Sequence, residues 1–557
     1  MTLQICVAQL NFVVGDMPGN ARKIVDTARA AYARGVRLVL TPELSICGYA
    51  AEDLFLRPAF IDACDDALKT ISRELADLKG LHVVVGHPEG GGLRTRSVAV
   101  TRRHNRASVL SEGRVVAHYN KRELPNYQVF DERRYFTPDD AAGVFEVEGV
   151  QVGLLICEDA WFDAPARAAR DAGAQLLAVL NASPFHAGKS AEREQRMRER
   201  VADCGLPLIY AHLVGGQDEV IFEGRSFAID SAGAVVARAE GFREATPDLQ
   251  VAVVAGAAQL TAPTATLAEL PSTEAELWDA LVLGVRDYLG KNGFKGAILG
   301  LSGGIDSALV LAIAVDAIGA DKIHAVMMPS PYTADISWID SRDMVKRLGV
   351  RYDEIAIAPL FDGFKQALAG QFSGLAEDTT EENIQARIRG TLLMALSNKT
   401  GAIVLTTGNK SEMATGYCTL YGDMAGGFAA IKDVVKTRVF ALARWRNQND
   451  PYGTGLEPIP ERIITRPPSA ELRPDQKDQD SLPEYEVLDA IIERYMENDE
   501  GVEALIADGF ERADVEKVTR LIKLNEYKRR QAPVGIRVTH RSFGKDWRYP
   551  MTNKFRA

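Results

Sequence analysis

The sequence has 557 residues, more than one hydrophobic core usually serves, so two or more domains are expected. Hydrophobic residues make up 46% and charged residues 25%, the balance of an ordinary globular protein. A net charge of −11 argues against a nucleic-acid partner, which needs a basic surface. No apolar run approaches the ~18 residues that span a membrane, and no signal peptide is evident. We expect a cytoplasmic protein without a membrane partner.

The six cysteines are scattered, with no CxxC pair and no metal-ligand spacing. In so long a chain they are expected to be reduced thiols, as in cytoplasmic proteins. The pattern therefore predicts neither a disulfide framework nor a zinc site.

In the first half of the chain, short apolar segments alternate with helical patterns. Residues 3–10 predict a strand, 19–35 an amphipathic helix and 36–41 a second strand. The alternation predicts packed α and β layers in a domain of residues 1–245, and the Thr-, Ala- and Pro-rich stretch 246–272 predicts a linker. Further strands are expected at 81–88, 150–157, 174–181 and 206–214.

The second half, residues 273–557, restarts with a helical pattern and then a strand, a glycine turn and another helix. With later strands at 323–329 and 402–408, this βαβ rhythm predicts an open parallel sheet with helices on both faces. Residues 366–382 and 446–480 lack periodicity and predict loops. Such loops either close over substrate or are surface insertions without a role.

The glycine turn at 300–307 (GLSGGIDS) follows an apolar strand and opens an apolar helix. Unpaired N–H groups and the helix dipole favour an anion at such a turn. Ser302 and Ser307 can donate hydrogen bonds, and Asp306 can hold a magnesium ion against phosphates. The residues expected to bind ATP here are Gly300, Leu301, Ser302, Gly303, Gly304, Ile305, Asp306 and Ser307.

No lysine follows these glycines, so the turn is not a Walker A loop. It resembles the SGGxDS loop of the ATP pyrophosphatase family. The resemblance implies a Rossmann-like, doubly wound parallel sheet and the cleavage of ATP to AMP and pyrophosphate through an adenylated substrate.

A second block, residues 404–417, also follows a strand and resembles a pattern of NAD synthetases. In that pattern a threonine contacts ATP and a glutamate five residues later binds magnesium, which implies these roles for Thr407 and Glu412. Lys436 matches a family lysine on the ATP phosphates. Ser469 stands where small relatives carry an ATP-contacting threonine.

The same resemblance implies that Asn383, Glu412 and Lys528 bind the precursor deamido-NAD. Lys528 lies in a cationic tail, which either pairs with a substrate phosphate or is a solvated surface. One departure concerns Leu420, because stand-alone relatives carry a lysine there. The local substrate contact must differ.

In the first half, three reactive side chains each follow a predicted strand: Glu43, Lys121 and Cys157. They resemble the Glu-Lys-Cys triad of the nitrilase superfamily over roughly residues 1–250, which implies an α-β-β-α sandwich. Glu132 resembles an extra glutamate that some nitrilases place beside the triad. Cys6 and Cys47 occupy comparable settings and are interpreted as core residues.

The triad chemistry explains these residue types. A free cysteine is only about 3% thiolate at pH 7, so attack on an amide needs a base or a nearby cation. Glu43 would take the thiol proton, pass it to departing ammonia and then activate water. Lys121 would stabilise the thiolate and the developing oxyanion. By family resemblance, glutamine selectivity comes from Tyr127, Ser183 and Lys189, and Glu158 could face the substrate ammonium, although each of these four could be merely structural.

A nitrilase-type glutaminase joined to an SGGxDS loop resembles the glutamine-dependent NAD synthetases. This implies amidation of deamido-NAD to NAD with ammonia from glutamine, the last step of NAD biosynthesis, with ATP as co-substrate and magnesium as cofactor. The family also implies a sheltered ammonia channel and a homo-oligomer. An amidotransferase with another acceptor, such as a tRNA, is the alternative, and a scaffold built of inactive domains is a third reading.

Overall fold

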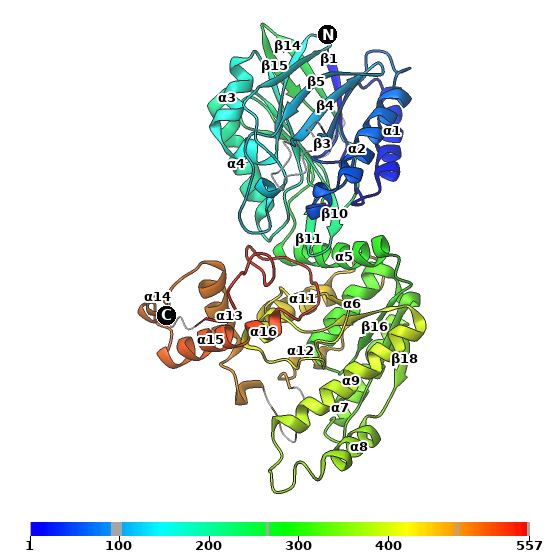
Figure 1. The fold of residues 1–557 in the computed structure, drawn as a ribbon, viewed down its shortest axis with the longest axis vertical. Helices are drawn as coiled ribbons and strands as arrows, with labels where there is room; N and C mark the ends of the chain where they lie inside the picture. The colour runs from blue at the N-terminus through cyan, green and yellow to red at the C-terminus, as the bar shows by residue number, and fades with distance from the viewer. Residues whose placement is uncertain are drawn as a thin grey trace. The chain divides into compact units, whose positions relative to one another are not determined.

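The computed structural model describes residues 2–90, 103–262, 267–469, 471–473, 476 and 478–553. The chain divides into two compact units, Met1–Pro271 and Ser272–Ala557 (Figure 1). No helix in the described ranges is both long and apolar enough to cross a bilayer.

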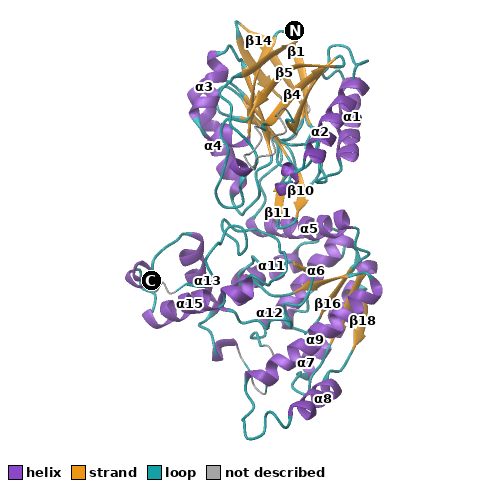
Figure 2. Cartoon of the chain, viewed as in Figure 1, coloured by secondary structure: helices purple, strands orange, loops and turns teal. Residues whose placement is uncertain are grey.

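The first unit contains two large β-sheets and one short hairpin (Figure 2). The seven-stranded sheet has the order β15-β14-β1-β2-β3-β4-β5 and the six-stranded sheet the order β13-β12-β9-β8-β7-β6. The strands are β1 (Thr2–Val7), β2 (Leu38–Leu40), β3 (His82–Pro88), β4 (Asn105–Ser111), β5 (Arg114–Asn120), β6 (Gly143–Val147), β7 (Val150–Ile156), β8 (Leu176–Asn181), β9 (Leu208–His212), β12 (Phe227–Ile229), β13 (Val235–Arg238), β14 (Asp248–Val254) and β15 (Ala257–Thr261), with the hairpin β10 (Val214–Gln217) and β11 (Val220–Glu223).

The central strands of each sheet are buried on both faces, which explains the continuous apolar runs in the sequence. On β8, Leu176, Ala178 and Leu180 join the core between the sheets. Leu177 and Val179 point the other way, toward a cluster with α3 and α4. The outer face of the seven-stranded sheet packs on α1 and α2 in the same manner. These layers confirm the α-β-β-α sandwich; the helices are α1 (Met17–Ala33), α2 (Pro58–Glu74), α3 (Asp163–Asp171) and α4 (Lys189–Cys204).

The structure differs from the predicted linker at 246–272. Residues 248–261 form β14 and β15, and β14 pairs antiparallel with β1 inside the first unit. The stretch is rich in Ala, Thr and Pro and its outer strand β15 lies at the sheet edge, so the weak alternation of the two strands was hidden. Residues 263–266 of the predicted linker lie outside the described ranges.

The second unit is built on one parallel sheet of order β18-β17-β16-β19-β20. The order reverses between β16 and β19, and right-handed crossovers then place helices on opposite faces. This confirms the doubly wound fold, and ligands of such folds bind where the strand order reverses. The strands are β16 (Ala297–Gly300), β17 (Ile323–Met327), β18 (Arg351–Glu354), β19 (Ile403–Thr406) and β20 (Phe428–Ala429).

Helices bury the strands of this sheet on both sides. Ile298 of β16 and Val404 of β19 pack against apolar residues of α8 and α9. Helix α6 is buried almost throughout, because all but a few of its residues are apolar. The helices are α5 (Thr273–Asn292), α6 (Ile305–Ile318), α7 (Asp335–Leu348), α8 (Ala358–Leu368), α9 (Thr379–Thr400), α10 (Lys410–Thr415), α11 (Lys436–Gln448), α12 (Glu461–Thr465), α13 (Tyr485–Ile492), α14 (Val502–Ala507), α15 (Arg512–Leu524) and α16 (Glu526–Arg529).

Candidate active sites

Cys157 lies directly after β7 and begins a short 3-10 helix, Cys157–Trp161. Its φ of 47° is in the left-handed region, which is strained for a residue with a side chain and recurs at functional sites. Burial and the negative charge of Glu43 raise the pKa of the Cys157 thiol, while Lys121 opposes the shift. The resting thiol is therefore protonated and needs a base.

Lys121 lies between two carboxylates in the first unit. Its Nζ is 2.7 Å from Oε1 of Glu43 and 2.8 Å from Oε1 of Glu132, and all three side chains are buried. Burial raises the pKa of Glu132 to about 7, against the opposing effect of Lys121. Because buried charges must be paired, this arrangement fixes the ammonium beside the thiol. The structure brings the four predicted catalytic residues together.

Two hydrogen-bond donors that sequence reasoning missed hold these carboxylates. The Asn105 side-chain amide donates to Oε1 of Glu43 at 2.6 Å, and the Tyr49 hydroxyl donates to Glu132 at 2.9 Å. The second oxygen of Glu43 accepts from the backbone N–H of Ala182 at 3.1 Å. Asn105 opens β4 and carried no local signal, because its role depends on the pairing of distant strands.

Asp159 joins the lysine and cysteine segments. Its carboxylate accepts from the backbone N–H groups of Arg122 and Glu123, just after Lys121, at 3.0 and 2.7 Å. It also accepts from the N–H of Ile156 and from the Tyr119 hydroxyl. The sequence offered one signal for this role, which is the position of Asp159 two residues after the predicted nucleophile Cys157.

The predicted glutamine-binding residues contact one another or neighbouring side chains. The Tyr127 hydroxyl donates to the Glu158 carboxylate at 2.9 Å. The ammonium of Lys189 lies 4.2 Å from the centre of the Trp161 ring and 2.9 Å from Glu192. Burial lowers the pKa of Lys189 and raises the pKa of Glu158. The charge of Lys189 opposes the shift at Glu158, and Cys157 opposes the shift at Lys189. Ser183 is buried, and its hydroxyl accepts from Arg193 at 3.2 Å.

In the second unit, the glycine turn joins β16 to α6 at the point where the strand order reverses. The N-cap residue of α6, Gly304, has no side chain to cap the helix, so the N-terminal N–H groups are available to an anion. The hydroxyls of Ser302 and Ser307 lie 3.1 Å apart. Gly303 has φ 79°, and a Cβ there would lie 2.7 Å from the backbone oxygen of Ser337. Only glycine fits.

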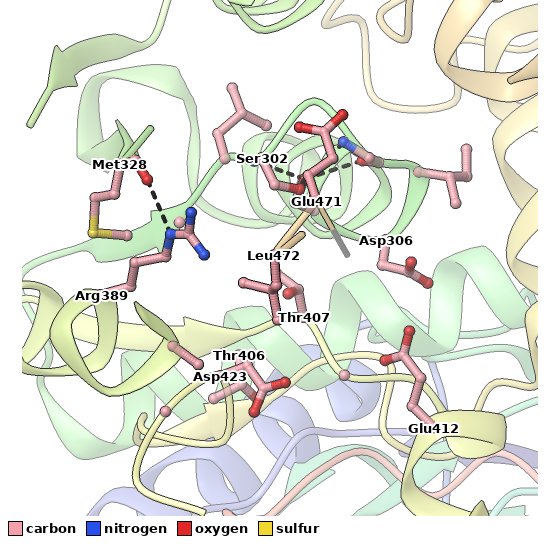
Figure 3. Close-up of a pocket in the computed structure, with 18 of the residues that line it drawn as sticks. Ser302, Asp306, Met328, Arg389, Thr406, Thr407, Glu412, Asp423, Glu471 and Leu472 are labelled. Atoms are coloured by element: carbon pink, nitrogen blue, oxygen red, sulfur yellow. Dashed lines mark hydrogen bonds between the residues drawn. The ribbon is translucent and has the colours of Figure 1, made fainter. Parts of the chain in front are cut away.

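A pocket lies over this turn (Figure 3). Gly303 is the one residue of the turn that does not line it. Thr406 and Thr407 at the end of β19 form another wall, as expected at the carboxyl ends of parallel strands. The predicted ATP and metal residues that line the pocket are Gly300, Leu301, Ser302, Gly304, Ile305, Asp306, Ser307, Thr407, Glu412, Lys436 and Ser469.

Two carboxylates and one lysine gather at the phosphate end of the pocket. Lys436 Nζ is 2.6 Å from Asp306 and 3.6 Å from Glu412. Burial and the charge of Asp306 raise the pKa of Glu412 to about 8, with Lys436 opposing. The side-chain amide of Asn409 donates to Asp306 at 2.9 Å. One cation for two acids leaves an excess of negative charge.

Two of the predicted deamido-NAD residues do not line this pocket. Lys528 donates to the carbonyls of Gly416 and Cys418 at 2.8 and 2.7 Å. Asn383 accepts from the Thr419 hydroxyl at 2.8 Å. Both therefore hold the same segment, which continues into Leu420, the position that departs from the small relatives. Of the three predicted residues, only Glu412 faces the nucleotide pocket.

Comparisons with known proteins identify the families of the two halves of the chain. The carbon-nitrogen hydrolase family model matches residues 4–259 and the NAD synthase family model matches residues 277–532. A carbon-nitrogen hydrolase unit and an NAD synthase unit in one chain define the class as an amidotransferase ligase.

The relatives make the class specific. The glutamine-dependent NAD(+) synthetase of Xanthomonas campestris is 48% identical, covering 100% of this chain and 98% of its own. The protein of that name from Thermotoga maritima is 42% identical, covering 100% and 99%. A structure of glutamine-dependent NAD+ synthetase from Acinetobacter baumannii with ADP has a TM-score of 0.78 at 42% identity, covering 99% of this chain and 98% of that one. The chain belongs to the glutamine-dependent NAD(+) synthetases.

Proposed function

We propose that this enzyme converts deamido-NAD to NAD, using ATP and the side-chain nitrogen of glutamine. The first unit hydrolyses glutamine to glutamate and ammonia. The second unit joins the precursor carboxylate to AMP, releases pyrophosphate, and lets ammonia displace AMP. Full-length relatives do not favour the alternative of a tRNA acceptor.

In the first unit, Cys157 attacks the glutamine amide while Glu43 takes the thiol proton. Lys121 is held as an ammonium and stabilises the sulfur anion and then the oxyanion. Glu43 returns the proton to departing ammonia, and then activates water to hydrolyse the γ-glutamyl thioester. Tyr127, Glu158, Ser183 and Lys189 are proposed to hold the zwitterionic end of glutamine.

In the second unit, the turn at 300–307 and Lys436 are proposed to bind the β- and γ-phosphates as one leaving group. The absence of a Walker lysine supports this division, because that side chain serves γ-phosphoryl transfer. Ser302 and Ser307 donate to phosphate oxygens, and Thr407 and Ser469 flank the nucleotide. Asn383 and Lys528 are proposed to bind deamido-NAD from the 416–419 segment.

Asp306 and Glu412 are proposed to hold magnesium. The fit rests on two carboxylates that share one lysine, an arrangement in which burial and the charge of Asp306 raise the pKa of Glu412. In the described ranges no group of three or more acidic, histidine or cysteine side chains forms a complete metal site. Magnesium commonly takes one or two carboxylates and completes its shell with substrate phosphates. Bound there, it would neutralise charge on the leaving pyrophosphate.

The observation that carries the proposal is the presence in one chain of a buried Glu-Lys-Cys cluster and a phosphate turn without a Walker lysine. The test supplies purified protein with ATP, magnesium, deamido-NAD and glutamine labelled with ¹⁵N on the side chain. NAD that carries the label should appear in the same amount as glutamate and AMP, neither of which is labelled. Unlabelled NAD, or ADP in place of AMP, would contradict the scheme.

Location and assembly remain part of the proposal. All six cysteines are unpaired thiols, which supports a reducing, cytoplasmic setting. Homo-oligomerisation is proposed from the family expectation alone and can be measured by light scattering.

A further inference from the structure

Arg389 of α9 lines the nucleotide pocket and has no acidic partner among the described residues. Its Nε donates to the backbone oxygen of Met328 at 2.9 Å. Burial lowers the pKa of Arg389 to about 10, while Glu471 and Asp423 act on it only from a distance. The side chain is half-buried, and a guanidinium withdrawn from solvent normally pairs with a carboxylate. The remaining N–H groups of Arg389 are thus available to a ligand.

Among the described residues that line the pocket, the other two cations are already engaged. Lys436 pairs with Asp306 and Glu412. Arg466 lies 3.5 Å from Glu471 and donates to the carbonyl of Gly303 in the phosphate turn. Both therefore belong to the phosphate side.

Arg389 lies across the pocket from that side. Figure 3 shows Arg389 and Met328 on the side away from Asp306 and Glu412. The wall there is apolar: a Cβ built on Gly300 would be 3.3 Å from Cε of Met328 and 3.5 Å from Cδ1 of Leu393. With phosphates anchored at the turn, the nucleoside is the part of ATP that reaches this wall. A flat purine ring packs well against thioether and leucine side chains, whereas a charged phosphate is disfavoured beside such apolar groups.

We propose that Arg389 binds the adenine end of ATP, its guanidinium plane oriented by the Met328 carbonyl and packed against the purine ring. This inference rests on the use of ATP proposed above. It assigns affinity for the nucleobase to a residue other than those proposed to bind the phosphates. A planar guanidinium stacks on aromatic rings, which a lysine ammonium does not reproduce. The carbonyl bond fixes the plane before the nucleotide arrives.

The test uses two half-ligands, adenosine without phosphate and pyrophosphate without a base. Their affinities are measured by calorimetry in the full-length protein and in Arg389→Met, Arg389→Lys and Lys436→Met. Arg389→Met should weaken adenosine about five- to thirtyfold, as expected for loss of a desolvated cation–ring contact. It should leave pyrophosphate within about twofold, because the phosphate cations are untouched. Lys436→Met should show the reverse pattern.

Arg389→Lys separates charge from shape, and should lose most of the adenosine affinity although it keeps a cation. Adenosine binding unchanged in Arg389→Met, or a loss of pyrophosphate binding alone, would overturn the inference. The melting curve reports whether the second unit of each variant folds. Should Arg389→Met fail to fold, Arg389→Lys provides the same comparison of adenosine with pyrophosphate. A wild-type protein that binds neither half-ligand would overturn the ATP site itself.

Discussion

Replacing Asn105 with alanine tests whether the hydrogen bonds around Glu43 support catalysis. The amide donates to Oε1 of Glu43 at 2.6 Å in a buried setting. A hydrogen bond to a charged group contributes about 1.5–3 kcal/mol, and about 1.4 kcal/mol is a factor of ten in rate. Glu43 would still be held by Lys121 and the N–H of Ala182 but could rotate. We expect glutamine-driven NAD formation to fall about 10- to 150-fold on this basis.

The assay compares NAD formation from glutamine with formation from ammonium, which bypasses the thiol site. Asn105→Ala should depress only the first rate. Asn120→Ala is the matched control, because Asn120 ends β5 opposite Arg106 of β4 and forms hydrogen bonds with Arg106 and Asp139 rather than with the triad. Equal loss of both rates, or an Asn120→Ala effect as large as that of Asn105→Ala, would refute the positioning role.

Three further predictions concern the two sites. Cys157→Ala should abolish glutamine-driven NAD formation and leave ammonium-driven formation largely intact; loss of both would defeat the assignment of two sites. Asp306→Ala should stop AMP release while basal glutamine hydrolysis continues, and continued AMP release would contradict the magnesium role. Because ligation needs the ionised Glu412, whose pKa is about 8, the magnesium concentration for half-maximal rate should fall as pH rises toward 8 and level off above it. Glu412→Gln should remove that pH dependence; a flat profile in the wild type would count against it.

Much of the architecture could be predicted because the central strands of each sheet are buried on both faces. Runs such as residues 174–181 are apolar throughout, so β8 was recognisable without alternation. The strands at 248–261 were not recognisable, because β15 lies at the edge of its sheet and carries Gln and Thr toward solvent. Composition alone therefore suggested a linker where the chain returns to pair with β1.

The candidate sites show the same division between local and distant information. The turn at 300–307 could be predicted because strand, glycines and serines are contiguous. Asn105, Tyr49 and Arg389 could not, since each acts on a partner contributed by another element. The three residues predicted to bind deamido-NAD came from family resemblance. The structure separates Glu412 from Asn383 and Lys528, which hold the 416–419 segment.

The two charge clusters differ in a way that fits their chemistry. In the first unit, one ammonium, two glutamates and a thiol are sealed from solvent. Moving the proton from Cys157 to Glu43 leaves their total charge unchanged, so attack creates no new buried net charge. The raised pKa of Glu132 limits the resting negative charge. In the second unit, Asp306 and Glu412 carry an excess of negative charge once Glu412 is ionised, and they open onto a pocket where a cation delivered with a nucleotide can neutralise that charge. A closed cluster thus suits internal proton transfer, and an open one suits a charged ligand that enters and leaves at each turnover.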